Sequence, residues 1–178
     1  MEYLDICDEN GKLTGKKELK KEVHKQGLWH RSAHIWVINS KKEILIQKRS
    51  SIVDNHPNEW DISAAGHISA GEDYITSAQR ETEEELGIKI DLNYLILIGV
   101  VKQQSERPGY INKEINPVYI LKADLDLSQI KLQEEEVSEV KFIDYKELKR
   151  IIESKNKTFV PHDDEYKLLF DYLENKWN

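Results

Sequence analysis

The sequence predicts a mixed α/β fold, because segments rich in β-branched apolar residues flank one long segment without glycine or proline. The β-rich segments lie before residue 65 and again between residues 90 and 123. The uninterrupted segment, residues 74–86, is predicted to be a central helix, and two further helical patterns end the chain. Strands on both sides of one helix, followed by terminal helices, favour a mixed sheet that is covered on both faces.

The N-terminal half is expected to supply most of the first strands. Tyr3–Cys7 is predicted to be a short strand. The charged stretch Lys16–Lys25 is expected to lie mostly in solvent. Ala33–Ile38 and Ile44–Lys48 are strongly apolar and β-branched, and the polar turn Asn39–Lys42 is expected to join them as a hairpin.

The remaining elements follow in a simple order. Trp60–Ala64 leads into a glycine-containing loop before the central helix. Three further strands are expected at Ile90–Val101, Asn116–Ala123 and Val140–Ile143, with a long polar loop over residues 103–116. Two C-terminal helices are expected within about residues 145–176, at 145–154 and 163–176. The length suits one domain that spans residues 1–178.

Composition excludes several classes of function. The net charge of −7 argues against affinity for nucleic acid polymers. No run of eighteen apolar residues is present, so no membrane span is expected. The N-terminus lacks the pattern of a signal peptide, and the single cysteine, Cys7, cannot form an internal disulfide. These features favour a cytoplasmic protein.

Three glutamates on the central helix predict a metal site. Glu84 and Glu85 follow Glu81 by three and four residues, which places the three carboxylates on one helix face. Glutamate runs are usually solvated, and like charges at this spacing repel. A hard divalent cation turns that repulsion into coordination, so we expect Mg²⁺, with Mn²⁺ as the alternative. Asp73 is expected to cap the start of this helix and Gly87 its end.

The glutamates belong to a longer pattern that resembles the signature box of the Nudix hydrolases, G-x5-E-x7-R-E-U-x-E-E-x-G-U, where U is aliphatic. The box runs over residues 66–88, and its fixed positions are all present: Gly66, Glu72, Arg80, Glu81, Glu84, Glu85 and Gly87. Ile88 fills the last aliphatic position. Thr82 in the first aliphatic position departs from the pattern, although a small β-branched residue can still pack there.

The resemblance implies a fold, a reaction and a set of site residues. The fold would be the Nudix α/β/α sandwich with a mixed sheet and the Nudix loop-helix. The reaction would be Mg²⁺-dependent hydrolysis of a diphosphate linked to an organic group. The implied metal ligands are Glu81, Glu84, Glu85 and the backbone carbonyl of Ala65. Arg80 would hold carboxylates in place by bidentate hydrogen bonds, and Glu72 would be the loop carboxylate that either orients it or binds the metal through a water.

The substrate and the general base are less constrained. Arg49, Arg107 and Tyr110 are candidate substrate-binding residues, Arg49 as a phosphate clamp or simply a surface charge. A nucleoside diphosphate derivative is the expected substrate; coenzyme A, nucleotide sugars and dinucleoside polyphosphates stay open. The base is Glu81, Glu114 or one of Glu134–Glu136. The protein is expected to act on this small molecule as a monomer or homodimer.

The region before the box resembles the isopentenyl-diphosphate isomerase branch of the Nudix superfamily. The resemblance rests on the following segments: His24, Gly27–Arg31, Ile44–Ser50, Trp60 and Gly66–His67. It implies isomerase activity as an alternative, and it aligns His24, His30 and His67 with metal-binding histidines of the isomerases. Ala64–Ala65 occupies the position of the essential isomerase cysteine, which disfavours that activity. A catalytically silent nucleotide-binding protein is the third hypothesis.

Overall fold

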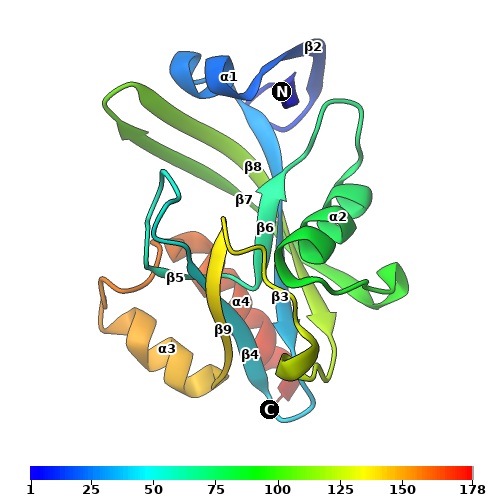
Figure 1. Ribbon diagram of the computed structural model, residues 1–178, viewed down its shortest axis with the longest axis vertical. Helices are drawn as coiled ribbons and strands as arrows, with labels where there is room; N and C mark the ends of the chain where they lie inside the picture. Colours follow the sequence, from blue (N-terminus) through cyan, green and yellow to red (C-terminus); the bar gives the residue numbers. More distant parts are fainter. Residues whose placement is uncertain (178) are drawn as a thin grey trace.

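The structure is a computed structural model that describes residues 1–177, so Asn178 of the predicted domain lies outside the described residues. Its main sheet runs in the order β5-β4-β3-β8-β7, with β6 paired to β3 and β9 to β4 (Figure 1). The strands are β3 (His30–Ile38), β4 (Glu43–Arg49), β5 (Trp60–Asp61), β6 (Ala64–His67), β7 (Leu95–Arg107), β8 (Tyr110–Lys122) and β9 (Val137–Asp144). β3 and β8 are parallel and the other pairs are antiparallel, which confirms the predicted mixed sheet.

Helices cover both faces of this sheet. Alternate side chains of β3 point to opposite faces. Trp36 and Ile38 pack with α3 (Tyr145–Glu153) and α4 (Asp163–Trp177), whereas Ile35 packs with α2 (Tyr74–Leu86). The α/β/α sandwich expected from the sequence is therefore confirmed (Figure 1).

The central helix begins and ends where its capping residues predict. The Asp73 carboxylate accepts hydrogen bonds from the backbone N–H groups of Ile75 and Thr76, and Gly87 adopts the left-handed conformation with φ of 66°. Thr82 is fully buried, and its hydroxyl donates to the Ala78 carbonyl at 2.8 Å. The small departure from the aliphatic pattern is thus accommodated by a local hydrogen bond.

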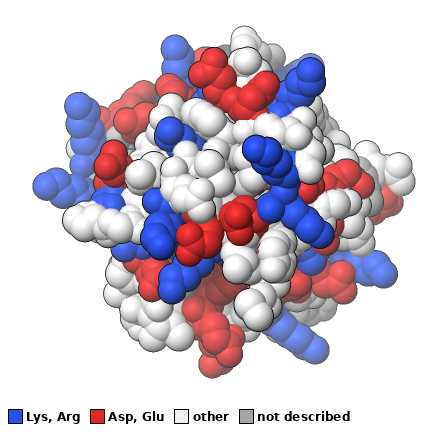
Figure 2. Space-filling view, turned by 90° about the horizontal axis from the view of Figure 1, so that it is seen from above, with Lys and Arg blue, Asp and Glu red and all other residues white. Residues whose placement is uncertain are grey.

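The charged stretch Lys16–Lys25 is mostly exposed or partly exposed, as predicted, and it forms regular secondary structure. β1 (Tyr3–Cys7) pairs with β2 (Leu13–Leu19), and α1 (Lys20–Gln26) follows. Val23 of α1 is fully buried against Leu4 and Leu28, so one apolar residue among lysines is enough to dock the helix. This unit lies above one end of the sheet, and the face seen from above carries both basic and acidic side chains (Figures 1 and 2).

The predicted polar loop at residues 103–116 is wrong. β7 and β8 continue through it as a long hairpin that turns at Pro108–Gly109, where Gly109 has φ of 77°. Cross-strand pairs such as Gln103 with Glu114 hold the two strands together. A hairpin that is largely exposed at its tip needs no apolar alternation, so its sequence resembles a loop. Among the described residues, no helix combines the length and apolar character needed to cross a membrane.

Candidate metal-binding site

The carboxylates of the box gather where α2 meets β6. Glu81 is 8% exposed and Glu85 is 4% exposed, so these two do not belong to a solvated face, whereas Glu84 is exposed. The Glu81 carboxyl lies directly over Gly66: a Cβ at Gly66 would stand 1.9 Å from Glu81 Cδ. Glycine is required here for this close approach.

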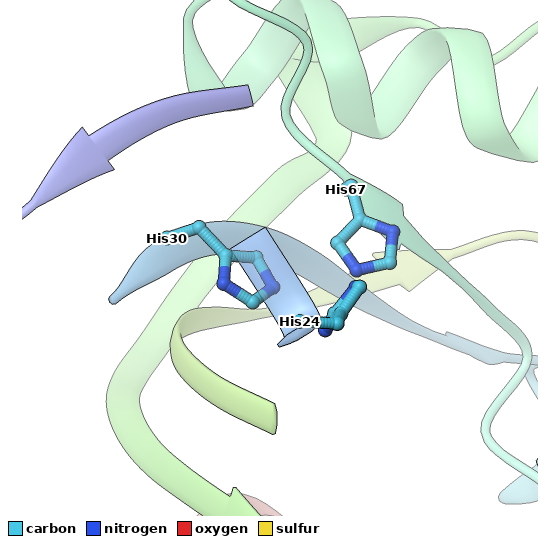
Figure 3. A group of neighbouring side chains, drawn as sticks. All are labelled: His24, His30 and His67. Atoms are coloured by element: carbon cyan, nitrogen blue, oxygen red, sulfur yellow. The ribbon is translucent and has the colours of Figure 1, made fainter. Parts of the chain in front are cut away.

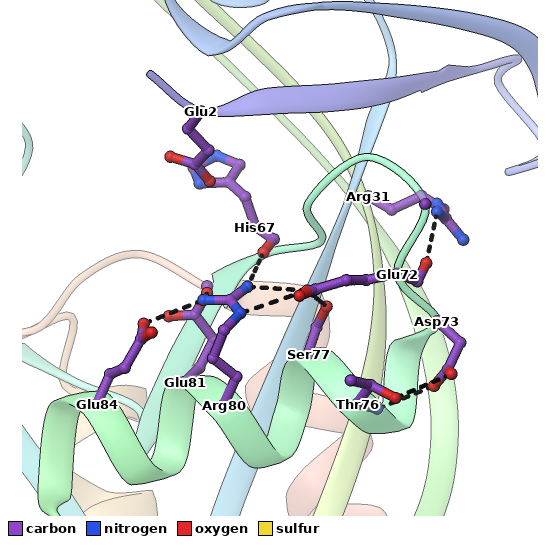
Figure 4. Close-up of polar contacts among 12 residues, drawn as sticks. Glu2, Arg31, His67, Glu72, Asp73, Thr76, Ser77, Arg80, Glu81 and Glu84 are labelled. Atoms are coloured by element: carbon purple, nitrogen blue, oxygen red, sulfur yellow. Dashed lines mark hydrogen bonds and ion pairs between the residues drawn. The ribbon is translucent and has the colours of Figure 1, made fainter.

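Arg80 connects the carboxylates of Glu72, Glu81 and Glu84 through hydrogen bonds (Figure 4). Its Nη1 donates to Glu81 Oε1 at 2.7 Å and to Glu84 Oε2 at 3.0 Å. Its Nε and Nη2 donate to Glu72 Oε2, and Nη2 also donates to the His67 carbonyl at 3.0 Å. The predicted contacts of Arg80 with carboxylates are therefore present, and Glu72 is the loop residue that orients the guanidinium.

Each of the three glutamates has one oxygen held by the protein. Arg80 holds Glu81 Oε1 and Glu84 Oε2, while Glu85 Oε2 accepts from the Ala65 N–H at 3.2 Å and from Gln47 Nε2 at 3.3 Å. The second oxygen of each accepts no hydrogen bond from the described residues. Burial, reinforced by neighbouring carboxylates, raises the pKa of Glu81 to about 7 and the pKa of Glu85 well above its usual value. A divalent cation would offset that cost and use the free oxygens.

Of the candidate bases outside the helix, Glu136 is the one beside the box. It lies in the turn before β9, and its charge adds to burial in raising the pKa of Glu81 and of Glu85. The same turn is attached to α2, since the Gln133 N–H donates to the Glu85 carbonyl at 3.2 Å. Glu114 instead lies among histidines.

Three histidines from separate elements form a second cluster (Figure 3). Ligand nitrogens of His24, His30 and His67 all lie within 4.8 Å of one another. Glu114 Oε1 is 3.5 Å from His30 Nε2 and 3.2 Å from His67 Nε2. The His24 ring stacks on Tyr110 at 4.4 Å between centroids. Imidazole nitrogens and one carboxylate make a donor set typical of a transition metal.

The protonation pattern of this cluster fits a cation. His30 Nδ1 lies 3.0 Å from the Leu28 carbonyl, which can only accept, so in the neutral ring Nε2 carries a lone pair toward Glu114. Neither ring nitrogen of His24 has a hydrogen-bond partner among the described residues, and burial lowers the pKa of His24 to about 4. Lone pairs that face a carboxylate repel it unless a proton or a metal cation lies between them.

Two of the three predicted substrate residues, Arg49 and Tyr110, lie near the loop residue Asn55, and Arg107 lies over the Tyr110 ring. Arg49 Nε donates to the Asn55 carbonyl at 2.9 Å, and Arg49 Nη1 is 3.1 Å from Asp61 Oδ2. Tyr110 lies near Asn55, and the Arg107 guanidinium lies 4.5 Å from the Tyr110 ring centroid. Arg107 and Tyr110 also line a cleft of about 470 Å³ at the hairpin tip, which no box carboxylate lines.

Sequence reasoning missed Gln47 and a buried charge network. His34 Nδ1 lies 2.6 Å from Glu165 Oε2, and His162 Nε2 lies 2.9 Å from Asp61 Oδ1. Although burial opposes it, Asp61 raises the pKa of His162 to about 9. These contacts attach the start of α4 to the sheet. The only sign of these contacts in the sequence is that His34 and Gln47 are polar residues within otherwise apolar strands.

The fold is the α/β/α sandwich that the sequence resemblance implied, and the glutamates of the box lie on its loop-helix α2. The family model described as the NUDIX domain matches residues 28–165. The chain therefore belongs to the Nudix family. The match covers the sheet, the box helix and the beginning of α4.

Known relatives agree with this assignment. Nudix hydrolase 3 of Arabidopsis thaliana is 38% identical over 98% of this chain, but the chain spans only 24% of that protein's length. An uncharacterized Nudix hydrolase of Clostridium acetobutylicum is 41% identical over 86% of the chain and 75% of its own length. An isopentenyl-diphosphate Delta-isomerase of Pectobacterium atrosepticum is 30% identical over 78% of the chain and 75% of its own length. A crystal structure from Deinococcus radiodurans, 21% identical, shares the fold with a TM-score of 0.71 and covers 96% of this chain and 98% of its own.

Proposed function

We propose that the protein is a Mg²⁺-dependent hydrolase that cleaves the diphosphate linkage of a nucleoside diphosphate derivative. The observation that carries this proposal is the carboxylate arrangement: Glu81, Glu84 and Glu85 each have one oxygen held by a protein donor and one oxygen free. Three carboxylates on one helix face, each held through one oxygen by a protein donor, suit Mg²⁺, and Mn²⁺ is the alternative ion. Family membership supports the same assignment.

The residues around the cation have separate roles in this proposal. Bound Mg²⁺ supplies neutralisation of the diphosphate and a lowered pKa for an attacking water. Arg80 keeps Glu81 and Glu84 in place, and the Ala65 carbonyl stays a proposed additional ligand. Glu136 accepts the proton of the water, because it lies beside the box, where its charge acts on Glu81 and Glu85, and its carboxylate accepts a long hydrogen bond of 3.4 Å from Gln133 Nε2. Glu81, with a pKa of about 7, is the alternative base.

The organic part of the substrate is assigned to the hairpin side of the site. Arg49 would contact a phosphate, and Tyr110 with Arg107 would contact the nucleoside through stacking and charge. Isomerase activity is disfavoured, because Ala64 and Ala65 of β6 stand where the isomerases carry their essential cysteine. The only cysteine of the sequence, Cys7, lies in β1. Burial raises the pKa of Cys7 to about 11, so its thiol is poorly suited to proton transfer.

A substrate panel tests the proposal. The purified protein is incubated with nucleoside diphosphate derivatives, coenzyme A and dinucleoside polyphosphates, and released phosphate or pyrophosphate is measured with and without Mg²⁺. We expect turnover that requires Mg²⁺ and stops on chelation. Binding without turnover in Mg²⁺, Mn²⁺ and Co²⁺ would support the silent nucleotide-binding protein. Deuterium incorporation into isopentenyl diphosphate would support the isomerase.

The histidine cluster is proposed to hold a second, softer cation, as the isomerase-like sequence implies. The support is the donor set of His24, His30, His67 and Glu114, together with the unpartnered nitrogens of His24. Three buried ligands, from α1, β3 and β8, and the partly buried His67 of β6 would tie the N-terminal unit to the sheet. This cation is not required for the carboxylates to bind Mg²⁺.

Metal analysis tests the second site. The protein as purified is expected to contain close to one equivalent of a transition metal such as Zn²⁺ or Mn²⁺, measured by elemental mass spectrometry. The double variant His30→Asn, His67→Asn is expected to lose it, because it removes two of the ligands. His56→Asn is the matched control, since His56 is exposed, pairs with Glu59 and does not belong to the cluster. Equal metal content in the double variant and the control would exclude the site.

A further inference from the structure

Gln47 is a polar residue at a core position of β4. Its side chain is 2% exposed. Leu45, two residues earlier on the same strand, packs in the core beneath α2, whereas Ile44 and Ile46 pack on the opposite face. Alternation therefore places Gln47 on the face that carries α2. An aliphatic residue is usual at such a position, and a buried amide costs free energy unless it is hydrogen-bonded. The contacts of Gln47 should therefore show why an amide is present.

The contacts of Gln47 lead to one metal-site oxygen. Its Nε2 donates to Glu85 Oε2 at 3.3 Å, and the Ala65 N–H donates to the same oxygen at 3.2 Å. Two donors on Oε2 leave Oε1 as the oxygen of Glu85 that is open to a cation. The acceptor oxygen of Gln47 is buried without a hydrogen-bond partner among the described residues. Reversing the amide would place its oxygen against the Glu85 carboxylate, so the contact with Glu85 determines its orientation.

A neutral donor is suited to this position. Arg80 already supplies one positive charge to Glu81 and Glu84. A second cationic side chain at residue 47 would pair with Glu85 and compete with a divalent ion for it. An amide orients the carboxylate without that competition. The unpartnered Gln47 oxygen has a free-energy cost, which a residue with only a packing role would avoid.

We propose that Gln47 is a positioning residue for the divalent-cation site: it holds Glu85 so that Oε1 faces the ion. Gln47 acts through Glu85 and touches neither the ion nor the substrate. The proposal rests on the proposed function, because it requires the box carboxylates to bind the cation. Outer-shell partners of this kind commonly change metal affinity about 10- to 100-fold when replaced.

Binding of Mn²⁺ to Gln47→Met and Gln47→Asn tests the proposal. Met matches the length of Gln but cannot donate, and Asn keeps the amide but is too short to reach Glu85. Unbound Mn²⁺ is measured by electron paramagnetic resonance. Only the bound Mn²⁺ that excess Mg²⁺ displaces is analysed, because Mg²⁺ competes for carboxylate ligands and not for histidines, so this fraction reports on the carboxylate site. We expect about tenfold weaker binding in both variants. Gln104→Met, at an exposed hairpin position, is the matched control and should bind as the native protein does.

A double-mutant cycle separates positioning from folding. In a Glu85→Gln background, Gln47→Met is expected to cause no further loss of Mn²⁺ affinity or of kcat. An equal loss in that background would mean that Gln47 does not act through Glu85 and would overturn the proposal. Native affinity in both Gln47 variants would also overturn it, while leaving the Mg²⁺ hydrolase intact. A native protein without Mg²⁺-displaceable Mn²⁺ would overturn the proposed function as well.

Discussion

Replacing Glu84 and Glu85 together with glutamine is expected to lower Mg²⁺-dependent hydrolysis on the order of 10³-fold, or about 4 kcal/mol of transition-state stabilisation. Each of the two carboxylates has one oxygen that no protein donor holds among the described residues. The amide of glutamine is a far weaker ligand for a hard cation. The measurement is kcat/KM on the best substrate of the panel, together with Mn²⁺ affinity. Both quantities should fall together if the glutamates act through the cation.

The matched control removes the same two charges elsewhere. Glu9 and Glu83 are exposed, so Glu9→Gln with Glu83→Gln should keep native activity. Without metal, the Glu84→Gln, Glu85→Gln variant should melt no lower than the native protein, because burial already disfavours the charged form of Glu85. Activity of the variant within a few-fold of native would refute the carboxylate site.

Gly66→Ala is expected to lower hydrolysis on the order of 10²-fold while the protein stays folded. The added methyl would stand 1.9 Å from Glu81 Cδ, so Glu81 must leave its position over β6. Arg80 then loses its shortest carboxylate contact, at 2.7 Å, and the set of free oxygens is disturbed. The measurement is kcat/KM for the panel substrate, with the melting temperature taken alongside.

Gly99→Ala provides the comparison for that substitution. Neither Gly66 nor Gly99 has a positive φ, so alanine is not strained by the backbone at either position. A Cβ at Gly99 meets the end of the flexible Leu168 side chain at 2.8 Å, which can move aside. Equal activity losses in the two variants would show that crowding in the sheet, and not displacement of Glu81, causes the effect.

The prediction from sequence was most accurate where structure is local. The helix bounds 74–86 and both caps follow from Asp73, Gly87 and the absence of helix breakers between them. The same helix periodicity placed Glu81, Glu84 and Glu85 on one face. The prediction failed near the hairpin tip, where exposed polar residues of the strands, such as Gln104 and Ser105, carry no periodic signal.

The amino-acid sequence by itself determined the box helix, its carboxylates and the family, because these depend on spacings of three to eight residues along one chain segment. Only the tertiary structure decided which oxygen of each glutamate is free, and that Gln47, 38 residues away from Glu85, holds one of them. It also decided that Glu114 joins the histidines and that Glu136 lies beside the box. Such contacts arise from the order and register of strands in the sheet, and residue spacing does not encode these distances.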